Sequence, residues 1–307
     1  MISLKLISNI EVLDLHNEWL RVSLVPALGG KLLSVYNNEL SKEFIWTNTG
    51  MPLQVHPPGS NYDSGFIGGI DELIPNDIPQ LIDSIDYPDH GELWTTPLDH
   101  AVSGGTVTMS AILPLSGIKY VKSVSLDNNG PVIILDYQIT NQTKETRHFM
   151  WKLHAAANIE PGDRVLTGAV YGQVVDLDYS RFGHANEFNW PIIEEADASV
   201  IPENDRSVDF FYLYGSHGGR MHLSGNNKEH LFGYDYDQRI FPYQWYFASY
   251  GGFQDHYVAI LEPCTAMPID INTAIQKNQC TVLKAGETLT TRVKIFAGPA
   301  NRYQQEL

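Results

Sequence analysis

The chain has 307 residues, of which 43% are hydrophobic, 11% aromatic and 18% charged, and its formal net charge is −16. It is too apolar and too aromatic for a disordered chain. Its acidity excludes a general nucleic-acid binder, which needs Lys and Arg to neutralise phosphates. All-β domains often reach about 200–250 residues as one unit, so the length allows one large domain or two ordinary ones.

Alternation with a period of two predicts antiparallel strands along much of the chain. In chain order, the clearest alternating runs are 20–25, 118–126, 133–140 and 289–295, and Lys122 is the exception on the apolar side of the second run. Asn129-Gly130 lies between two such runs and predicts a hairpin. A short helix is expected near 273–279. No linker or repeat divides the chain, so we predict a single all-β domain over 1–307, built as a large antiparallel β-sandwich.

No stretch approaches the roughly 18 apolar residues that cross a bilayer. The N-terminus shows no secretory signal, and the two cysteines, Cys264 and Cys280, are expected to be reduced thiols. These features predict a soluble, cytoplasmic protein without membrane contact.

Four polar clusters lie in apolar or aromatic surroundings, at 68–76, 89–94, 150–154 and 257–265. In the last of them, Glu262 ends a run of four apolar residues. A buried carboxylate is costly unless it is paired or functional, and burial raises its pKa toward that of a useful base. A glutamate that accepts backbone hydrogen bonds at a strand end is an equal alternative.

Two histidines belong to these clusters. His154 stands between Trp151 and three alanines, where a core histidine is the commoner interpretation, but in a cleft it is a natural proton donor. His90 can simply stabilise a turn, whereas Glu92 and Trp94 beside it suit a polar ligand pocket. His90, Glu92 and His154 could also form a metal site if the fold brings them together, but no His-Glu-x-x-His or Cys-x-x-Cys motif is present. We expect neither a metal nor, without a nucleotide-binding motif, an organic cofactor.

These clusters, in this order, resemble the aldose 1-epimerase family, the galactose mutarotase-like proteins. The matching segments are the Pro-x-x-Gly-Gly turn at 26–30, the His-Gly motif at 90–91 and the segments around His154 and Glu262. The Gly-Glu-Leu-Trp continuation at 91–94 is similar to a divergent branch. The resemblance implies a large β-sandwich, in agreement with the alternation, and interconversion of the α and β anomers of a free sugar without any cofactor.

By this resemblance, Glu262 would remove the proton from the anomeric hydroxyl and His154 would protonate the ring oxygen. His90 would hydrogen-bond the sugar. The family commonly has an Asp-His pair, where the Asp binds sugar hydroxyls; here Asp209 is followed by Phe210, and a strand-edge aspartate is an equal alternative.

The family also commonly has an Asn-Arg pair before the His-Gly motif, and the corresponding stretch 71–76 contains no Arg. Asp71 and Asn76 of this stretch, with Glu92 and Trp94, are the remaining candidates for sugar binding. Trp94 is the best candidate for stacking on a sugar, whereas the aromatic run 241–247 is interpreted first as a buried strand.

Three other functions are compatible with the same residues. A carbohydrate-binding or sensing protein would bind sugar without turnover. A sugar-phosphate epimerase would need Arg or Lys near the phosphate. A lyase acting on an acidic polysaccharide is disfavoured by the net charge of −16. We therefore expect a neutral small-molecule carbohydrate as the partner of a monomer or homodimer, and no nucleic acid.

Overall fold

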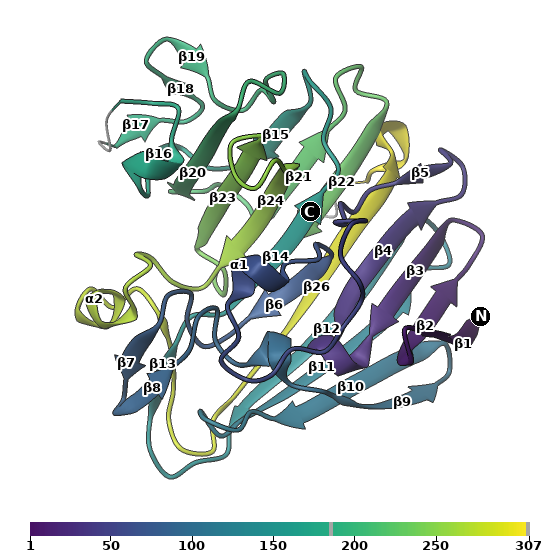
Figure 1. The fold of residues 1–307 in the computed structure, drawn as a ribbon, viewed down its shortest axis with the longest axis vertical. Helices are drawn as coiled ribbons and strands as arrows, with labels where there is room; N and C mark the ends of the chain where they lie inside the picture. Colours follow the sequence, from purple (N-terminus) through teal and green to yellow (C-terminus); the bar gives the residue numbers. More distant parts are fainter. Residues whose placement is uncertain (184–186, 305–307) are drawn as a thin grey trace.

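A computed structural model describes residues 1–183 and 187–304. Within these residues the strands form two large antiparallel sheets, one of twelve strands and one of eight, which lie face to face (Figure 1). The predicted all-β two-sheet sandwich is therefore confirmed.

The larger sheet carries the N-terminal strands at one edge and the segments near residue 190 at the other. Its strands, in spatial order, are β1 (Ile2–Ile7), β2 (Ile10–His16), β3 (Leu20–Val25), β4 (Lys31–Asn37), β6 (Ile70–Leu73), β14 (Lys152–Ala157), β24 (Tyr257–Cys264), β23 (Tyr243–Tyr250), β20 (Ser207–Tyr214), β16 (Tyr171–Val174) and β17 (Phe188–Asn189), with β5 (Lys42–Glu43) paired to β4.

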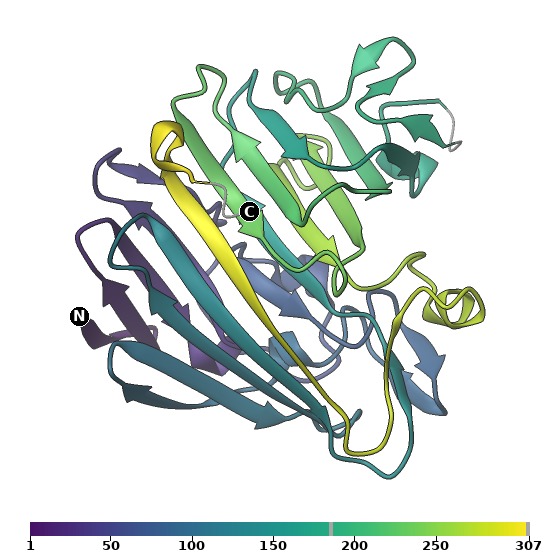
Figure 2. The ribbon, with the colours of Figure 1, turned by 180° about the vertical axis from the view of Figure 1, so that it is seen from behind.

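The smaller sheet is seen from behind in Figure 2, where the long yellow strand β26 crosses its middle. Its order is β15 (Arg164–Thr167), β21 (Arg220–Ser224), β22 (His230–Asp235), β26 (Thr288–Pro299), β12 (Val132–Asn141), β11 (Ile118–Leu126), β10 (Thr106–Ile112) and β9 (Asp99–Ser103).

Short elements complete the described part of the chain. The small pairs are β7 (Gln80–Ile82) with β8 (Ile85–Tyr87), β13 (Arg147–Phe149) with β25 (Thr281–Leu283), and β18 (Ile192–Ile193) with β19 (Ala196–Asp197). The helices are α1 (Tyr62–Gly65), α2 (Ile271–Gln276) and the 3-10 turns η1 (Pro26–Leu28), η2 (Leu93–Thr95), η3 (Leu177–Tyr179) and η4 (Ala300–Arg302). Helix α2 lies at the predicted place, beginning two residues earlier and ending three residues earlier. None of the helices in 1–183 and 187–304 is long and apolar enough to cross a membrane.

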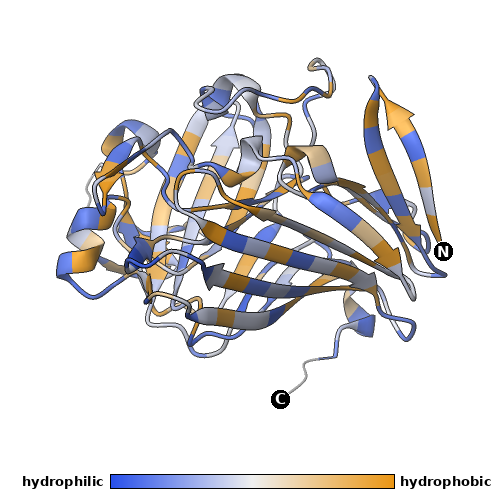
Figure 3. Ribbon diagram, turned by 90° about the horizontal axis from the view of Figure 1, so that it is seen from below, coloured by the Kyte–Doolittle hydropathy of each residue, from blue (hydrophilic) through white to orange (hydrophobic). Residues whose placement is uncertain are grey.

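The main core fills the space between the two sheets, and alternation decides which residues enter it. Along β12, Ile133, Leu135, Tyr137 and Ile139 are buried, whereas the residues between them are partly or fully exposed. Figure 3 shows the resulting bands of hydrophobic and hydrophilic residues along the strands. The predicted hairpin around Asn129-Gly130 is confirmed by the antiparallel pairing of β11 with β12.

Lys122, the exception in its alternating run, does face this core. It is fully buried, and its ammonium lies 2.7 Å from a carboxylate oxygen of Glu72 on the opposite sheet. The hydroxyl of Tyr137 donates to the same oxygen, Oε1, at 2.6 Å, and the ammonium also contacts Oε2 at 2.8 Å. A buried charge is tolerated only with such partners, so the exception in the pattern marks an ion pair between the sheets.

The outer face of the larger sheet is also covered, by the loops that carry α1 and η2. Here Leu73, Ala156, Val258 and Ile260 pack with Tyr62, Phe66 and Trp94 of the covering segments. Strands buried on both faces carry long apolar runs, which explains the unbroken runs before Glu262 and after His154. Figure 1 shows α1 lying over β6 and β14.

Candidate active site

A pocket opens between this outer face and the covering loops. It encloses about 730 Å³ of empty space, counting the open solvent at its mouth. Its ionisable lining residues are Asp63, Asp77, His90, Lys152, His154, His256 and Glu262, and its apolar and aromatic ones are Tyr62, Phe66, Tyr179, Phe210, Phe247, Phe253, Val258 and Ile260. Three residues predicted from separate sequence clusters, His90, His154 and Glu262, therefore meet in one pocket.

Strand alternation places two of these residues side by side. β14 pairs with β24 so that Lys152 lies opposite Cys264 and Ala155 lies opposite Leu261. This antiparallel register puts His154 next to Glu262, with both side chains on the outer face of the sheet. Lys152 precedes His154 by two residues and shares that face.

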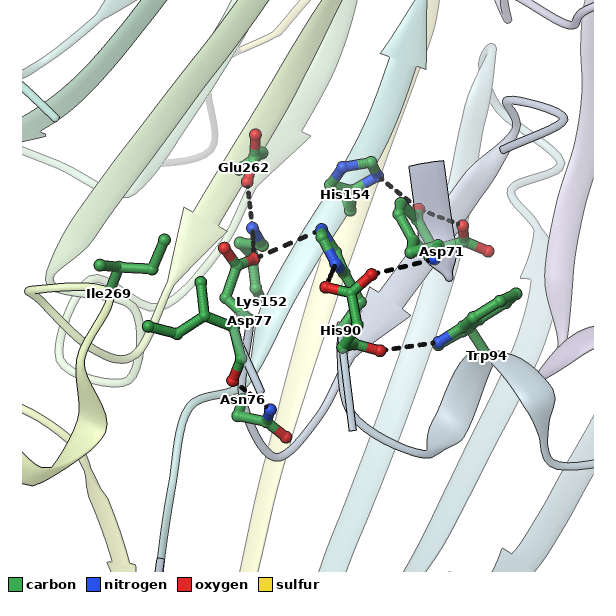
Figure 4. A network of polar contacts seen from close by, with 12 residues as sticks. Asp71, Asn76, Asp77, His90, Trp94, Lys152, His154, Glu262 and Ile269 are labelled. Carbon is green, nitrogen blue, oxygen red and sulfur yellow. Dashed lines mark hydrogen bonds and ion pairs between the residues drawn. The ribbon is translucent and has the colours of Figure 1, made fainter. Parts of the chain in front are cut away.

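A chain of alternating charges crosses the pocket floor (Figure 4). The Lys152 ammonium lies 2.7 Å from Oε2 of Glu262 and 2.5 Å from Oδ1 of Asp77. Nε2 of His90 lies 3.7 Å from that same Asp77 oxygen, and its Nδ1 lies 2.8 Å from Oδ1 of Asp89. Each cation in the chain is thus flanked by two carboxylates.

The charge chain sets the protonation of its members. Burial raises the pKa of Glu262, and the neighbouring Lys152 offsets part of that rise. Burial alone would raise the pKa of Asp77 as well, but Lys152 and His90 hold it below its ordinary value. Lys152 stays protonated, because Asp77 and Glu262 raise its pKa more than burial lowers it. Oε2 of Glu262 is buried, and no donor among the described residues makes a well-aligned hydrogen bond to it. Its contact with Lys152 is an ion pair.

His90 is the histidine of the site whose pKa is raised. Its ring stacks on Tyr62 with centroids 4.1 Å apart. Burial would lower its pKa, but the carboxylates of Asp77 and Asp89 outweigh that effect and raise it. The loop geometry depends on Gly91, whose φ of +70° is left-handed and whose added Cβ would lie 2.2 Å from the Ile74 carbonyl oxygen.

His154 is the neutral histidine. Burial, Lys152, His90 and Lys31 all lower its pKa, well below the ordinary value. The Tyr62 hydroxyl donates to Asp71 at 2.8 Å and lies 3.4 Å from Nδ1 of His154. Because that hydroxyl uses its proton on Asp71, it can only accept from His154. This arrangement favours the tautomer with the proton on Nδ1, which leaves Nε2 as an acceptor.

Two other predicted residues, Asp71 and Asn76, do not line the pocket but bind the segments that surround it. Asp71 binds the Lys31 ammonium at 2.6 Å as well as the Tyr62 hydroxyl. Asn76 donates from Nδ2 to the carbonyls of Ile78 and Pro88, both at 2.7 Å, and thereby closes the loop that carries Asp77 and His90.

Glu92 and Trp94 follow His90 but turn away from the pocket. Both oxygens of Glu92 accept backbone N–H groups, from Leu115 at 2.7 Å and Ser116 at 3.0 Å. The Trp94 indole packs edge-on against Tyr62 and is only 6% exposed. It therefore offers no face for stacking in this pocket, contrary to the prediction.

Asp209 lies on the core side of β20. Its carboxylate pairs with Arg181 at 3.0 Å and accepts from the Tyr250 hydroxyl at 3.2 Å. The next residue, Phe210, points the other way and lines the pocket. Phe210 thus presents a phenyl ring to the pocket, and Asp209, the residue predicted to bind sugar hydroxyls, is turned away from it.

Sequence reasoning missed Asp77, Lys152 and most of the aromatic lining. For Lys152 a signal existed, because residues two apart on a strand share a face and His154 was already a candidate. Asp77 stands in an irregular loop, where no periodicity predicts direction. The run 241–247 combines both interpretations, since Trp245 is fully buried and Phe247 lines the pocket.

No group of three or more His, Cys, Asp or Glu side chains in the described ranges is arranged to hold a metal ion. The polar groups of the pocket instead pair with one another. The arrangement provides a carboxylate, an imidazole with a raised pKa and an imidazole with a lowered pKa around one space. Such a set can remove a proton from one oxygen and deliver a proton to another.

Solved structures share this fold along nearly the whole chain. A galactose mutarotase-like protein from Clostridium acetobutylicum matches with a TM-score of 0.71 at 13% identity, over 97% of this chain and 98% of that one. One from Lactobacillus casei matches with a TM-score of 0.68 at 16% identity, over 93% and 99%. A candidate aldose 1-epimerase from Klebsiella pneumoniae gives 0.74 at 13%, over 96% and 81%.

No protein-family model and no curated protein matches the chain by sequence. The structural matches show that the chain has the galactose mutarotase-like β-sandwich fold, as the sequence resemblance predicted.

Proposed function

We propose that the protein interconverts the α and β anomers of a neutral free sugar. The convergence of His90, His154 and Glu262 on one pocket of a galactose mutarotase-like fold carries the proposal. Anomer exchange needs a base and an acid on either side of a hemiacetal, and no other reactant. The pocket supplies both in a partly water-excluded space.

Glu262 is the base. Its carboxylate takes the proton from the anomeric hydroxyl while the ring oxygen is protonated, and the C1–O5 bond breaks to give the open-chain aldehyde. Burial raises the pKa of Glu262, which strengthens it as a base, and the neighbouring Lys152 favours its ionised form.

Of the two histidines, the charges favour His90 as the acid. The raised pKa of His90 favours its protonated form, whereas the lowered pKa of His154 favours a neutral ring with a free acceptor nitrogen. This reverses the roles implied by the resemblance, in which His154 donates. His90 protonates O5, and His154 accepts a hydrogen bond from a sugar hydroxyl. After rotation about C1–C2, O5 returns its proton to His90, and Glu262 returns its proton to O1.

The charges of the pocket favour a neutral sugar. Asp63, Asp77 and Glu262 line it against the two cations Lys152 and His90, and no Arg belongs to the described lining. A phosphate would meet these carboxylates without the bidentate partner that commonly binds it. A sugar-phosphate substrate is therefore disfavoured.

Saturation-transfer NMR over a panel of free aldoses tests the proposal. At least one neutral sugar should exchange anomers faster with protein than in buffer, in proportion to protein concentration. Exchange at the buffer rate for every sugar on the panel would refute the proposal. A binding-only protein is the second candidate, because the Lys152 ion pair can hold the Glu262 carboxylate away from a proton. It predicts saturable binding without exchange.

The pH profile of exchange should be bell-shaped. Activity is lost as pH falls through the pKa of Glu262, which lies above that of an ordinary glutamate, and is lost again as pH rises through the raised pKa of His90. Asp77 raises the pKa of both groups and Lys152 lowers both. Asp77→Asn should therefore move both limbs to lower pH, and Lys152→Met should move both to higher pH.

Asp178→Asn, an exposed change outside the pocket, is the control and should leave both limbs in place. If the two pocket variants moved the limbs in the same direction, the charge chain would not govern catalysis.

A further inference from the structure

The pocket contains a second, apolar group of side chains that the proposed chemistry does not use. Tyr179, Phe210, Phe247 and Phe253 line it; the three phenylalanines are partly buried and Tyr179 is exposed. They touch one another: the centroids of Phe210 and Phe247 are 5.7 Å apart, those of Phe247 and Phe253 are 5.6 Å apart, and Tyr179 lies 6.1 Å from Phe253. These four residues are called the aromatic wall below.

Strand register fixes the place of the aromatic wall relative to the catalytic groups. Phe247 on β23 pairs with Phe210 on β20 and with Ile260 on β24, so these three form a row across the sheet. The neighbouring row contains Trp245 and Glu262. Rows on one face of a sheet are two residues apart, or about 7 Å. The wall therefore begins one row away from the proposed base.

The three phenylalanine rings of the aromatic wall offer no partner to a hydroxyl group, and the polar groups beside them include the Tyr179 hydroxyl and the His256 ring, whose centroid lies 6.3 Å from that of Phe253. No Asn, Gln, Ser, Thr or Arg side chain belongs to the described pocket lining, and the charge chain lies along the Glu262 side. A sugar hydroxyl pressed against phenyl rings gives up its water without a replacement partner, which is unfavourable. An apolar group at the same place covers partly exposed rings and is favoured.

The orientation of the rings also argues against simple stacking on a sugar face. Stacking needs one open, flat ring surface. Phe247 stands at 85° to Phe253 and at 76° to Phe210, so the wall forms an apolar corner. Such a corner fits a methyl or larger apolar substituent.

We infer that the substrate is a reducing 6-deoxy sugar, whose methyl group sits in the aromatic wall while C1 and the ring oxygen face Glu262 and His90. This inference rests on the proposed function for the orientation of the sugar. One missing or added group in an apolar pocket changes discrimination by about 10- to 200-fold.

The test compares pairs of sugars that differ only at C6: D-fucose with D-galactose, D-quinovose with D-glucose, and L-rhamnose with L-mannose. Exchange is followed by saturation-transfer NMR and binding by ligand-observed NMR titration. In the most active pair, kcat/KM for the deoxy sugar should be at least about tenfold higher. Phe247→Asn should bring the ratio close to one, and so should Phe253→Ser if the first variant folds poorly.

Tyr171→Asn is the matched control, because Tyr171 is a partly exposed aromatic residue outside the pocket. It should keep the preference for the deoxy sugar. Equal or better exchange of the hydroxylated members overturns the inference and leaves the proposed function standing. Preferential binding of deoxy sugars without exchange supports the inference and removes the proposed function. If no deoxy sugar is bound or exchanged, the inference is overturned.

Discussion

Replacing Glu262 by glutamine is expected to slow anomer exchange by about a thousandfold, within the range that one acid–base group contributes. The amide has nearly the same shape but cannot accept the proton of the anomeric hydroxyl. Lys152 keeps its contact with Asp77 at 2.5 Å, so the floor of the pocket should persist. Saturation-transfer NMR at a fixed sugar concentration measures the loss, and a binding titration should show nearly unchanged affinity.

Two further variants sharpen this result. Glu203→Gln changes an exposed glutamate outside the pocket and should exchange sugars at the wild-type rate. Glu262→Asp keeps a carboxylate but draws it back by one methylene, and should retain a measurable part of the rate. Exchange by Glu262→Gln within twofold of wild type would show that another group is the base.

Replacing Lys122 by methionine should destabilise the protein by about 3–5 kcal/mol, the usual cost of breaking a buried ion pair. Its ammonium lies 2.7 Å from the Glu72 carboxylate, also contacts the Gly30 carbonyl at 3.1 Å, and is fully buried. Without it, Glu72 retains the hydrogen bond from Tyr137 but no counter-charge. Equilibrium urea unfolding, followed by tryptophan fluorescence, measures the change in the free energy of unfolding.

A double variant separates the lost attraction from the uncompensated charge. Glu72→Gln together with Lys122→Met removes both charges, and it should recover most of the lost stability, to within about 2 kcal/mol of wild type. If the single Lys122 variant unfolded at the wild-type urea concentration, the ion pair would contribute nothing to stability. If the double variant were the less stable one, the stranded carboxylate would not be the cause.

Alternation in the sequence was enough to predict the two-sheet sandwich, because a strand's buried face follows directly from a period of two. It could not decide which of two faces meets a ligand when both are covered. Asp209 and Phe210 show this limit: both lie on β20, one faces the core and the other lines the pocket. Their direction depends on how the sheets stack, and that arrangement arises only from contacts distant in sequence.

Within the candidate site, His90, His154 and Glu262 could be predicted as pocket residues, but the chain of ion pairs around them could not. Asp77 reaches Lys152 from an irregular loop, 75 positions away in the sequence. Conversely, sequence neighbours separate where the backbone turns sharply. Gly91, with φ of +70°, sends Glu92 toward the backbone of residues 115–116 while His90 stays in the pocket.

The central strands of the larger sheet carry two sets of side chains on alternate residues, one facing the pocket and one facing the interior of the sandwich. On β14 and β24, Lys152, His154 and Glu262 face the pocket, while Leu153 and Leu261 face the sandwich interior. Substitutions in the first set can alter chemistry and leave the interior packing untouched, and those in the second can alter packing without touching a proton-carrying group. The pocket-facing positions can therefore change during evolution, and with them the ligand that fits, while selection for folding acts on the intervening positions. An insertion of one residue in either strand would exchange the two sets and destroy both properties at once.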